Sequence, residues 1–233
     1  MDRSLGQTIV RSLYRPFLML ALDPMCLNLC LFSSILLGIL YLFFGAFGVV
    51  FSGVYGFDLS QVGLSFCGLL IGMVLATASD PMWQKNYERL VRKNADQSEP
   101  EYRLPPSIAG SFLVVIGLFW FAWTIQPTIS PVVPLTGAGF FGAGIVLVYS
   151  GIFTFLVEAF PLYAASALAA NSFARSSFAA AFPLFGIQMY KTLGFHWASS
   201  LLAFLTVAMA PFPYVFFVYG RRLRKKSRFS PAS

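Results

Sequence analysis

Long runs without a charged residue are the feature that most constrains the fold of this chain. No Asp, Glu, Lys or Arg occurs in residues 24–57, 59–79 or 104–157. A helix needs about 20 consecutive apolar residues to cross the hydrocarbon core of a bilayer. Each run is long enough for at least one crossing, and the last is long enough for two. The sequence therefore predicts an all-α membrane protein with several spans.

Composition supports this assignment and excludes one function class. Hydrophobic residues make up 58% of the chain and charged residues only 11%, whereas a soluble domain carries about 25% charged residues. The net charge is +7, but the basic residues lie in short blocks between apolar runs. That pattern is typical of charges that orient spans in a membrane. We expect a lipid bilayer as the surroundings and no nucleic acid as a partner.

Breaks in the apolar pattern divide the chain into six expected transmembrane helices. Asp23 and Pro24 are suited to cap and begin the first, and prolines within residues 126–134 separate the third from the fourth. Pro161 separates the fourth from the fifth, and Pro183 is expected to kink the fifth. The expected spans are residues 25–50, 59–78, 107–125, 133–156, 164–189 and 198–219.

The segments outside the spans predict the orientation. They are a head at residues 1–24 with an amphipathic segment, a polar loop at 79–104 and a basic tail at 220–233. Six spans place all three on one side of the membrane. That side then holds every Lys and Arg except Lys191 and Arg175, which lies inside a span. The positive-inside rule makes this side cytoplasmic.

Arg175 is the most unusual residue of the spans. A charge at that depth costs about 3 kcal/mol or more unless it faces protein or water. We therefore expect Arg175 to face the bundle interior or a cavity and to hydrogen-bond with polar groups there. Asn171 lies one turn earlier on the same helical face. Two roles remain open for this pair: part of a substrate or proton pathway, or a lock on helix packing.

Motifs for catalysis, cofactors and metals are absent from the sequence. The residues Gly137-x-Gly139-x-x-Gly142 match a dinucleotide-binding pattern, but that pattern needs a strand before it. Here the glycines are expected to thin a helix for packing or bending. The chain has one histidine, and Cys26 and Cys30 lie one helical turn apart without further ligands, so the sequence predicts no metal site. We expect no cofactor, no metal and no enzymatic activity.

Three stretches carry a family resemblance. Residues 100–124 (PEYRLPPSIAGSFLVVIGLFWFAWT), 161–190 (PLYAASALAANSFARSSFAAAFPLFGIQMY) and 193–204 (LGFHWASSLLAF) closely resemble fungal drug:proton antiporters of the major facilitator superfamily. Residues 15–24 and 37–51 resemble the start of that family's seventh helix. The resemblance covers about residues 15–230 and implies that the six spans correspond to helices seven to twelve, the carboxy-terminal half of the fold. The family's gating motif is only partly matched, since Gly72 and Asp80 are present but no Arg follows in register.

The resemblance also implies a function and a site. It implies export of drug or polyamine-like compounds in exchange for protons, at the plasma membrane. The first and fourth spans would line the cavity, and Glu158 is either part of the pathway or a solvated residue at the end of the fourth span. The candidate residues are Arg175, Asn171, Glu158, Asn28, Ser33, Tyr41, Thr136, Tyr149, Ser150 and Thr154.

The amino-terminal six-helix half of that family lies outside the matched region. We expect the chain to be a truncated product, a fragment of a longer reading frame or one half of a split transporter. Its expected partners are a small organic substrate, protons, and either the missing half or a second copy. The alternative function is a transporter-derived membrane protein with a structural or regulatory role and no transport alone.

Overall fold

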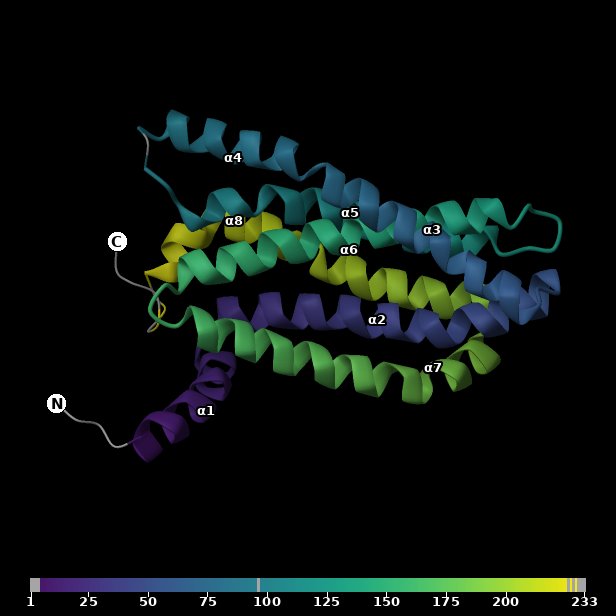
Figure 1. Ribbon diagram of the computed structural model, residues 1–233, viewed down its shortest axis with the longest axis horizontal. Coiled ribbons are helices and arrows are strands. Elements are labelled where there is room, and N and C mark those ends of the chain that lie inside the picture. The colour runs from purple at the N-terminus through teal and green to yellow at the C-terminus, as the bar shows by residue number, and fades with distance from the viewer. Residues whose placement is uncertain (1–4, 96, 226, 228, 230–233) are drawn as a thin grey trace.

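The computed structural model describes residues 5–95, 97–225, 227 and 229, and these form a bundle of helices without a strand (Figure 1). The expectation of an all-α membrane protein is confirmed. Residues 1–4 of the predicted head, Asp96 of the predicted loop and residues 226, 228 and 230–233 of the predicted tail lie outside the described residues. The elements are α1 (Leu5–Leu22), α2 (Pro24–Tyr55), α3 (Leu59–Ala78), α4 (Asp80–Lys93), the 3₁₀ helix η1 (Pro100–Arg103), α5 (Pro105–Thr124), α6 (Val132–Ala159), α7 (Ala164–Met209) and α8 (Pro211–Arg224).

Five helical segments in the described part of the chain are long and apolar enough to cross a membrane. The last, Ala164–Arg224, has 61 residues and would be about 90 Å long if straight, three times the hydrocarbon thickness. It reverses direction at Gly194, where φ is 74° and ψ is 168° (Figure 1). This backbone geometry favours glycine. The segment therefore runs through the bundle twice and supplies both the fifth and the sixth expected helix. Pro183, which was expected to kink the fifth helix, lies inside α7, and the kink stays a prediction.

Capping residues mark both ends of α2 and the start of α3. The Asp23 carboxylate accepts hydrogen bonds from the backbone N–H groups of Met25 and Cys26, both at 3.0 Å, and Pro24 occupies the first turn of α2. Gly56, with φ of 68°, ends α2, and Asp58 then forms a capping box that begins α3. The predicted cap at Asp23 is confirmed. The predicted spans 25–50, 59–78, 133–156 and 164–189 each lie within one observed helix, whereas 107–125 passes the end of α5 by one residue and 198–219 runs from α7 into α8. The limits of the spans in a membrane stay a prediction.

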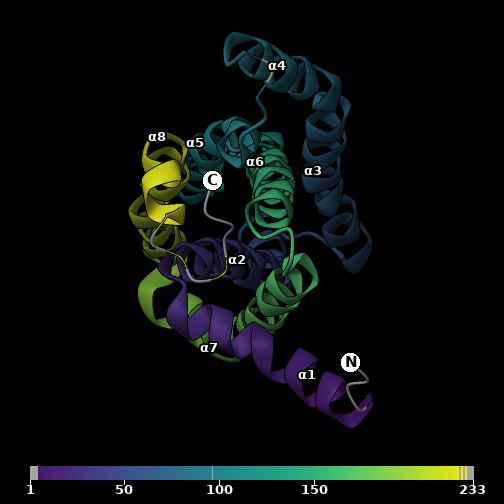
Figure 2. The same ribbon diagram turned by 90° about the vertical axis from the view of Figure 1, so that its left-hand side faces the viewer.

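Helix α2 lies in the middle of the bundle, with α6 and α7 beside it (Figure 2). Its buried surface includes the aromatic side chains of Phe32, Phe43, Phe47 and Phe51. The ring of Phe43 lies 5.0 Å from both Phe121 of α5 and Phe141 of α6, and Phe47 stacks on Phe121 at 5.5 Å. Aromatic rings at such distances add attraction beyond the area they bury. These side chains join α2, α5 and α6 into one core.

Helix α6 packs very closely against α3 and α5 through glycines. A Cβ added at Gly72 would lie 2.6 Å from the carbonyl carbon of Gly139, and closer still to its oxygen. A Cβ at Gly117 of α5 would lie 2.7 Å from the carbonyl oxygen of Gly137. Small residues permit this approach of helix backbones in bilayers. The expectation that the Gly137-x-Gly139-x-x-Gly142 glycines serve helix packing is confirmed.

The segment expected to be a polar loop, residues 79–104, contains helix α4. Asp80 lies in its first turn and Arg92 and Lys93 in its last, charges that favour each end of the helix dipole. None of its residues is buried. Sequence reading missed this helix because the many charged residues of the segment indicate a solvated loop, although Trp83, Tyr87, Leu90 and Val91 follow the spacing of one helical face. Helix α4, helix α1 and the end of α8 lie at the same end of the bundle (Figure 1).

Gly72 offers a direct test of the close approach between α3 and α6. We expect Gly72→Ala to cost about 1–3 kcal/mol, because the methyl group overlaps backbone atoms that cannot rotate away. The measurement is the midpoint of thermal unfolding in detergent, where each kcal/mol corresponds to roughly 2–4 °C. Gly63→Ala on the same helix is the control, since no atom lies within 4 Å of its added Cβ. Equal midpoints for both variants would contradict the packing.

Candidate functional site

Four of the predicted site residues form one cluster. Helix α2 contributes Ser33, helix α6 contributes Tyr149, and helix α7 contributes Asn171 and Arg175. These residues are as many as 142 positions apart in the numbering, yet each contacts another member of the group. We call Ser33, Tyr149, Asn171 and Arg175 the polar cluster. It lies where the three central helices meet.

Hydrogen bonds across the helices hold the buried part of the polar cluster. The side-chain amide of Asn171, which is 1% exposed, donates to the hydroxyl of Ser33 at 2.8 Å and lies 3.7 Å from the sulfur of Cys30. The Ser33 hydroxyl donates in turn to the carbonyl of Cys30 at 3.0 Å. The Tyr149 hydroxyl donates to the carbonyl of Ser33 at 3.1 Å. The carbonyl oxygen Oδ1 of Asn171 is buried and has no hydrogen-bond partner among the described residues.

Arg175 packs on aromatic rings of α6. Its guanidinium carbon lies 5.1 Å from the centre of the Tyr149 ring and 4.8 Å from that of Phe153. The two rings are stacked on each other, 5.5 Å apart and 14° from parallel. Such cation–π contacts stabilise a charge by about 1–2 kcal/mol when it is desolvated. Nε of Arg175 is buried without a hydrogen-bond acceptor among the described residues. The rings of Tyr149 and Phe153 therefore stabilise the charge of Arg175, a role that we had expected of polar groups alone.

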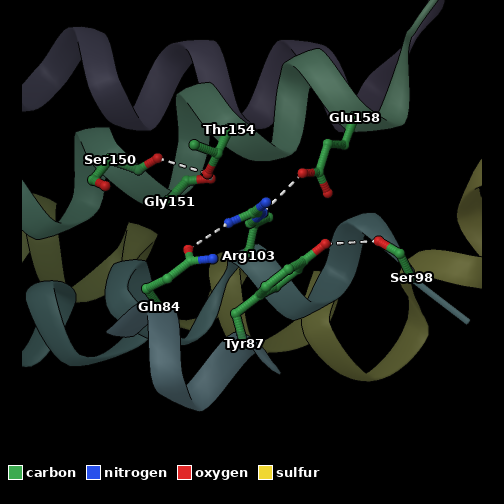
Figure 3. A network of polar contacts seen from close by, with 8 residues as sticks. All are labelled: Gln84, Tyr87, Ser98, Arg103, Ser150, Gly151, Thr154 and Glu158. Atoms are coloured by element: carbon green, nitrogen blue, oxygen red, sulfur yellow. Dashed lines mark hydrogen bonds and ion pairs between the residues drawn. The ribbon is translucent and has the colours of Figure 1, made fainter. Parts of the chain in front are cut away.

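Glu158 lies in a second polar network, near the end of α6 (Figure 3). Its Oε1 accepts a bond of 2.8 Å from Nε of Arg103, which also donates to Gln84 at 3.2 Å. The Arg103 guanidinium covers the ring of Tyr87 at 3.6 Å, and the Tyr87 hydroxyl pairs with Ser98 at 2.7 Å.

This network joins η1, α4 and α6. The second carboxylate oxygen of Glu158 is buried without a hydrogen-bond partner. Sequence reading missed Arg103, Gln84 and Tyr87, because a polar segment of unknown path gives no sign of which residues meet.

Ser150 and Thr154 lie on α6 between the two groups. The Thr154 hydroxyl donates to the carbonyl of Ser150 at 2.8 Å and also approaches that of Gly151 at 3.2 Å (Figure 3). Thr154 is exposed on the helix surface and Ser150 is partly exposed. Tyr149 and Phe153 immediately precede them in the chain. Helix α6 therefore carries polar groups from the polar cluster toward Glu158.

Three predicted site residues lie apart from both groups. The Asn28 amide bonds to the carbonyl of Pro24 on its own helix at 2.7 Å. Tyr41 is 45% exposed and contacts Phe44. Thr136 lies in an apolar groove of about 930 Å³ between α3, α5 and α6. The structure does not bring Asn28, Tyr41 and Thr136 to the polar cluster, and their role stays a prediction.

A buried ion pair that the sequence did not indicate ties the last helix to η1. Arg224 donates to Glu101 through Nε at 2.7 Å and through a terminal nitrogen at 2.9 Å. Their side chains are only 8% and 4% exposed. The hydroxyl of Ser227 also donates to the Asp23 carboxylate that caps α2. The described residues hold no group of three or more metal-ligating side chains.

Comparisons with known proteins identify fungal transporters. Efflux pump atB of Aspergillus terreus is 57% identical over 238 residues, covering 100% of this chain and 50% of the pump. The "Major facilitator superfamily multidrug transporter mdrA" of Aspergillus fumigatus is 42% identical, with 95% of this chain and 37% of that protein aligned. The "Probable drug/proton antiporter YHK8" of Saccharomyces cerevisiae is 41% identical, with 97% and 44% aligned. No family model matches the chain, and no solved structure does.

The chain belongs to the major facilitator superfamily. It spans about half the length, or less, of the curated relatives it matches. That coverage is consistent with the carboxy-terminal half that the sequence resemblance implies. The polar cluster is therefore a group of hydrogen-bonding side chains inside the membrane-spanning bundle of a major facilitator chain.

Two adjacent serines of α2 allow the contribution of the α2–α7 hydrogen bond to stability to be measured. Ser33 and Ser34 are both fully buried and both donate to the carbonyl of Cys30, but only Ser33 also accepts from Asn171. We expect Ser33→Ala to destabilise the bundle by about 1 kcal/mol more than Ser34→Ala, because it removes the oxygen acceptor of the Asn171 amide and leaves only the weaker contact with the sulfur of Cys30. Thermal unfolding midpoints of the two variants in detergent give the difference. A larger effect of Ser34→Ala would mean that the contact across helices contributes nothing.

Proposed function

We propose that this chain forms the carboxy-terminal half of a transporter that exports small organic compounds in exchange for protons. The observation that carries the proposal is the polar cluster, in which Arg175, Asn171, Ser33 and Tyr149 meet inside an apolar bundle. Ionisable residues within spans commonly belong to substrate or ion pathways. The names of the relatives as efflux pumps and drug/proton antiporters support the same conclusion.

The depth of Arg175 suits a substrate site. Arg175 follows Ala164, the first residue of α7, by a distance of roughly 16 Å at 1.5 Å per residue. The hydrocarbon core is about 30 Å thick, so this position is close to its middle. Transporters with related halves bind their substrates near the midplane, between the halves. The location of the polar cluster is therefore the one expected of a substrate site.

The exposed side of the polar cluster indicates that more protein, or water, covers it. Arg175 is partly exposed, and Thr154 is exposed on the neighbouring α6. A charged side chain that faced lipid at this depth would be unfavourable by several kcal/mol. An aqueous cavity closed by an amino-terminal half satisfies this requirement. A second copy of the chain would do the same, and we take the missing half as the partner.

Glu158 is our candidate for the proton pathway. Its Oε1 is bound to Arg103, while its buried Oε2 has no hydrogen-bond partner among the described residues. A carboxyl with one free oxygen has a place to hold a proton. Acids on the cavity side of spans are the usual members of proton relays. The competing role for Glu158 is an ion pair that only fixes η1 against α6.

The proposal includes an orientation in the plasma membrane with both termini in the cytoplasm. Helix α1, helix α4 and the end of α8 lie at one end of the bundle (Figure 1), and they carry most of the basic residues. We expect epitope tags at either terminus to be cut by protease only after intact cells are permeabilised. Cleavage of either tag by protease added outside would reverse the orientation.

A graft tests the transport function. We expect a hybrid, in which this chain replaces the corresponding part of the Aspergillus terreus pump, to restore drug resistance to a fungal strain that lacks its exporters. The chain expressed alone should restore none, because the proposed site is built from two halves. In the hybrid, Glu158→Gln should remove the dependence of export on the pH gradient. Correct membrane insertion of the hybrid without any export would favour a structural or regulatory role instead.

A further inference from the structure

We propose that the polar cluster binds the acidic group of small organic anions, with Arg175 as the residue that recognises the charge. This inference rests on the proposed function and specifies the substrate class of the same site. Three observations carry it: an Arg without an acidic partner, a second buried polar atom without a partner beside it, and a rigid aromatic surface beneath it.

Arg175 has no protein acid to neutralise it among the described residues. The ion pairs found there join Arg103 to Glu158, Arg221 to Glu99 and Arg224 to Glu101, and none includes Arg175. A guanidinium held at this depth attracts an anion strongly, because the surroundings screen its charge poorly. Its planar donors also match the geometry of a carboxylate better than an ammonium would.

Asp23, an acid near the start of α2, is also already occupied. It accepts hydrogen bonds from the N–H groups of Met25 and Cys26 and from the hydroxyl of Ser227. Its carboxylate is therefore held as the cap of α2. It cannot turn to Arg175 without exposing those donors, and the charge of Arg175 stays available for a ligand.

The atoms around Arg175 are arranged for a ligand with one acidic and one apolar part. Asn171 is 1% exposed, and its Oδ1 has no partner among the described residues, so this oxygen is still free to accept a hydrogen bond. Nε of Arg175 still lacks an acceptor. The stacked rings of Tyr149 and Phe153 hold the guanidinium in place from one side. Arg175 as a whole is partly exposed, so a carboxylate can approach the guanidinium from its exposed side, and the apolar part of the ligand can lie along the aromatic rings.

The same charge argues against polyamines at this position. A polyamine carries several positive charges, which Arg175 would repel in a medium that screens weakly. No ion pair among the described residues joins an acid to Arg175 and so offsets that repulsion. Of the two substrate classes expected from the sequence, drug-like compounds with an acidic group fit this half and polyamines do not.

Binding of a matched pair of probes tests the inference. The hybrid transporter is reconstituted in lipid nanodiscs, and 2-naphthoate and its neutral analogue 2-naphthamide are titrated by calorimetry at pH 7. We expect the carboxylate to bind at least about ten-fold more tightly, because a hydrogen bond to a charged group is stronger than one between neutral groups. Arg175→Gln should reduce this ratio to about one. Arg175→Lys should keep part of it, because the positive charge remains.

Arg222→Gln is the matched control, since it removes the same charge from an exposed position near the end of α8, and it should leave the ratio unchanged. Thermal unfolding midpoints show whether each variant is folded. Equal binding of the two probes by the unsubstituted protein would overturn the inference. An equal loss of both probes in Arg175→Gln would assign Arg175 to packing, or to an acid of the other half, and would also overturn it.

Measuring export of the two probes distinguishes a failure of this inference from a failure of the proposed transport function. Export of 2-naphthamide without selective binding of 2-naphthoate would support transport and refute the recognition of acids. Selective binding of 2-naphthoate that depends on Arg175, in a hybrid that exports neither probe, would support the recognition of acids and refute transport.

Discussion

The bilayer supplies no water to hydrogen-bond with polar groups, and this constraint accounts for most of the structure. Backbone groups satisfy it by forming helices throughout the spans. Hydroxyl groups satisfy it mainly by donating to carbonyls of their own helix, as Ser34 does to Cys30, Ser111 to Ser107 and Thr206 to Ala203. Most hydroxyl groups of the spans are therefore satisfied within their own helix, and only a few polar side chains form hydrogen bonds between two helices.

The exceptions to that rule mark the candidate site. Among the described residues, the buried side-chain N and O atoms without a hydrogen-bond partner belong to Glu158, Asn171, Arg175 and Ser200. The first three are residues that the sequence had already singled out. An unpartnered buried polar atom destabilises a fold by about 1–3 kcal/mol. A site that must bind and release a ligand has a physical reason to keep such atoms free.

Packing around the polar cluster is divided between two kinds of contact. Glycines bring α6 against α3 and α5 at backbone distance, and phenylalanines fill the wider space between α2, α5 and α6. Close backbone contact makes the position of α6 specific, because few shifts avoid a clash. The side chains of Tyr149 and Glu158 are thereby held at fixed positions along the bundle. At one end, the buried pair of Arg224 and Glu101 fixes the last helix against η1.

The sequence by itself determined the fold class and the cap at Asp23, and it singled out Arg175 and Asn171 as unusual residues of the spans. These follow from uncharged length, local capping chemistry and the energetic cost of a charge in lipid, all of which are properties of short segments. Only the tertiary structure decided that Ser33 and Tyr149 join Arg175 while Asn28, Tyr41 and Thr136 lie apart. It also placed the reversal at Gly194 and paired Arg103 with Glu158. Such contacts depend on how helices rotate and pack against each other, and the periodicity of a single helix does not contain that information.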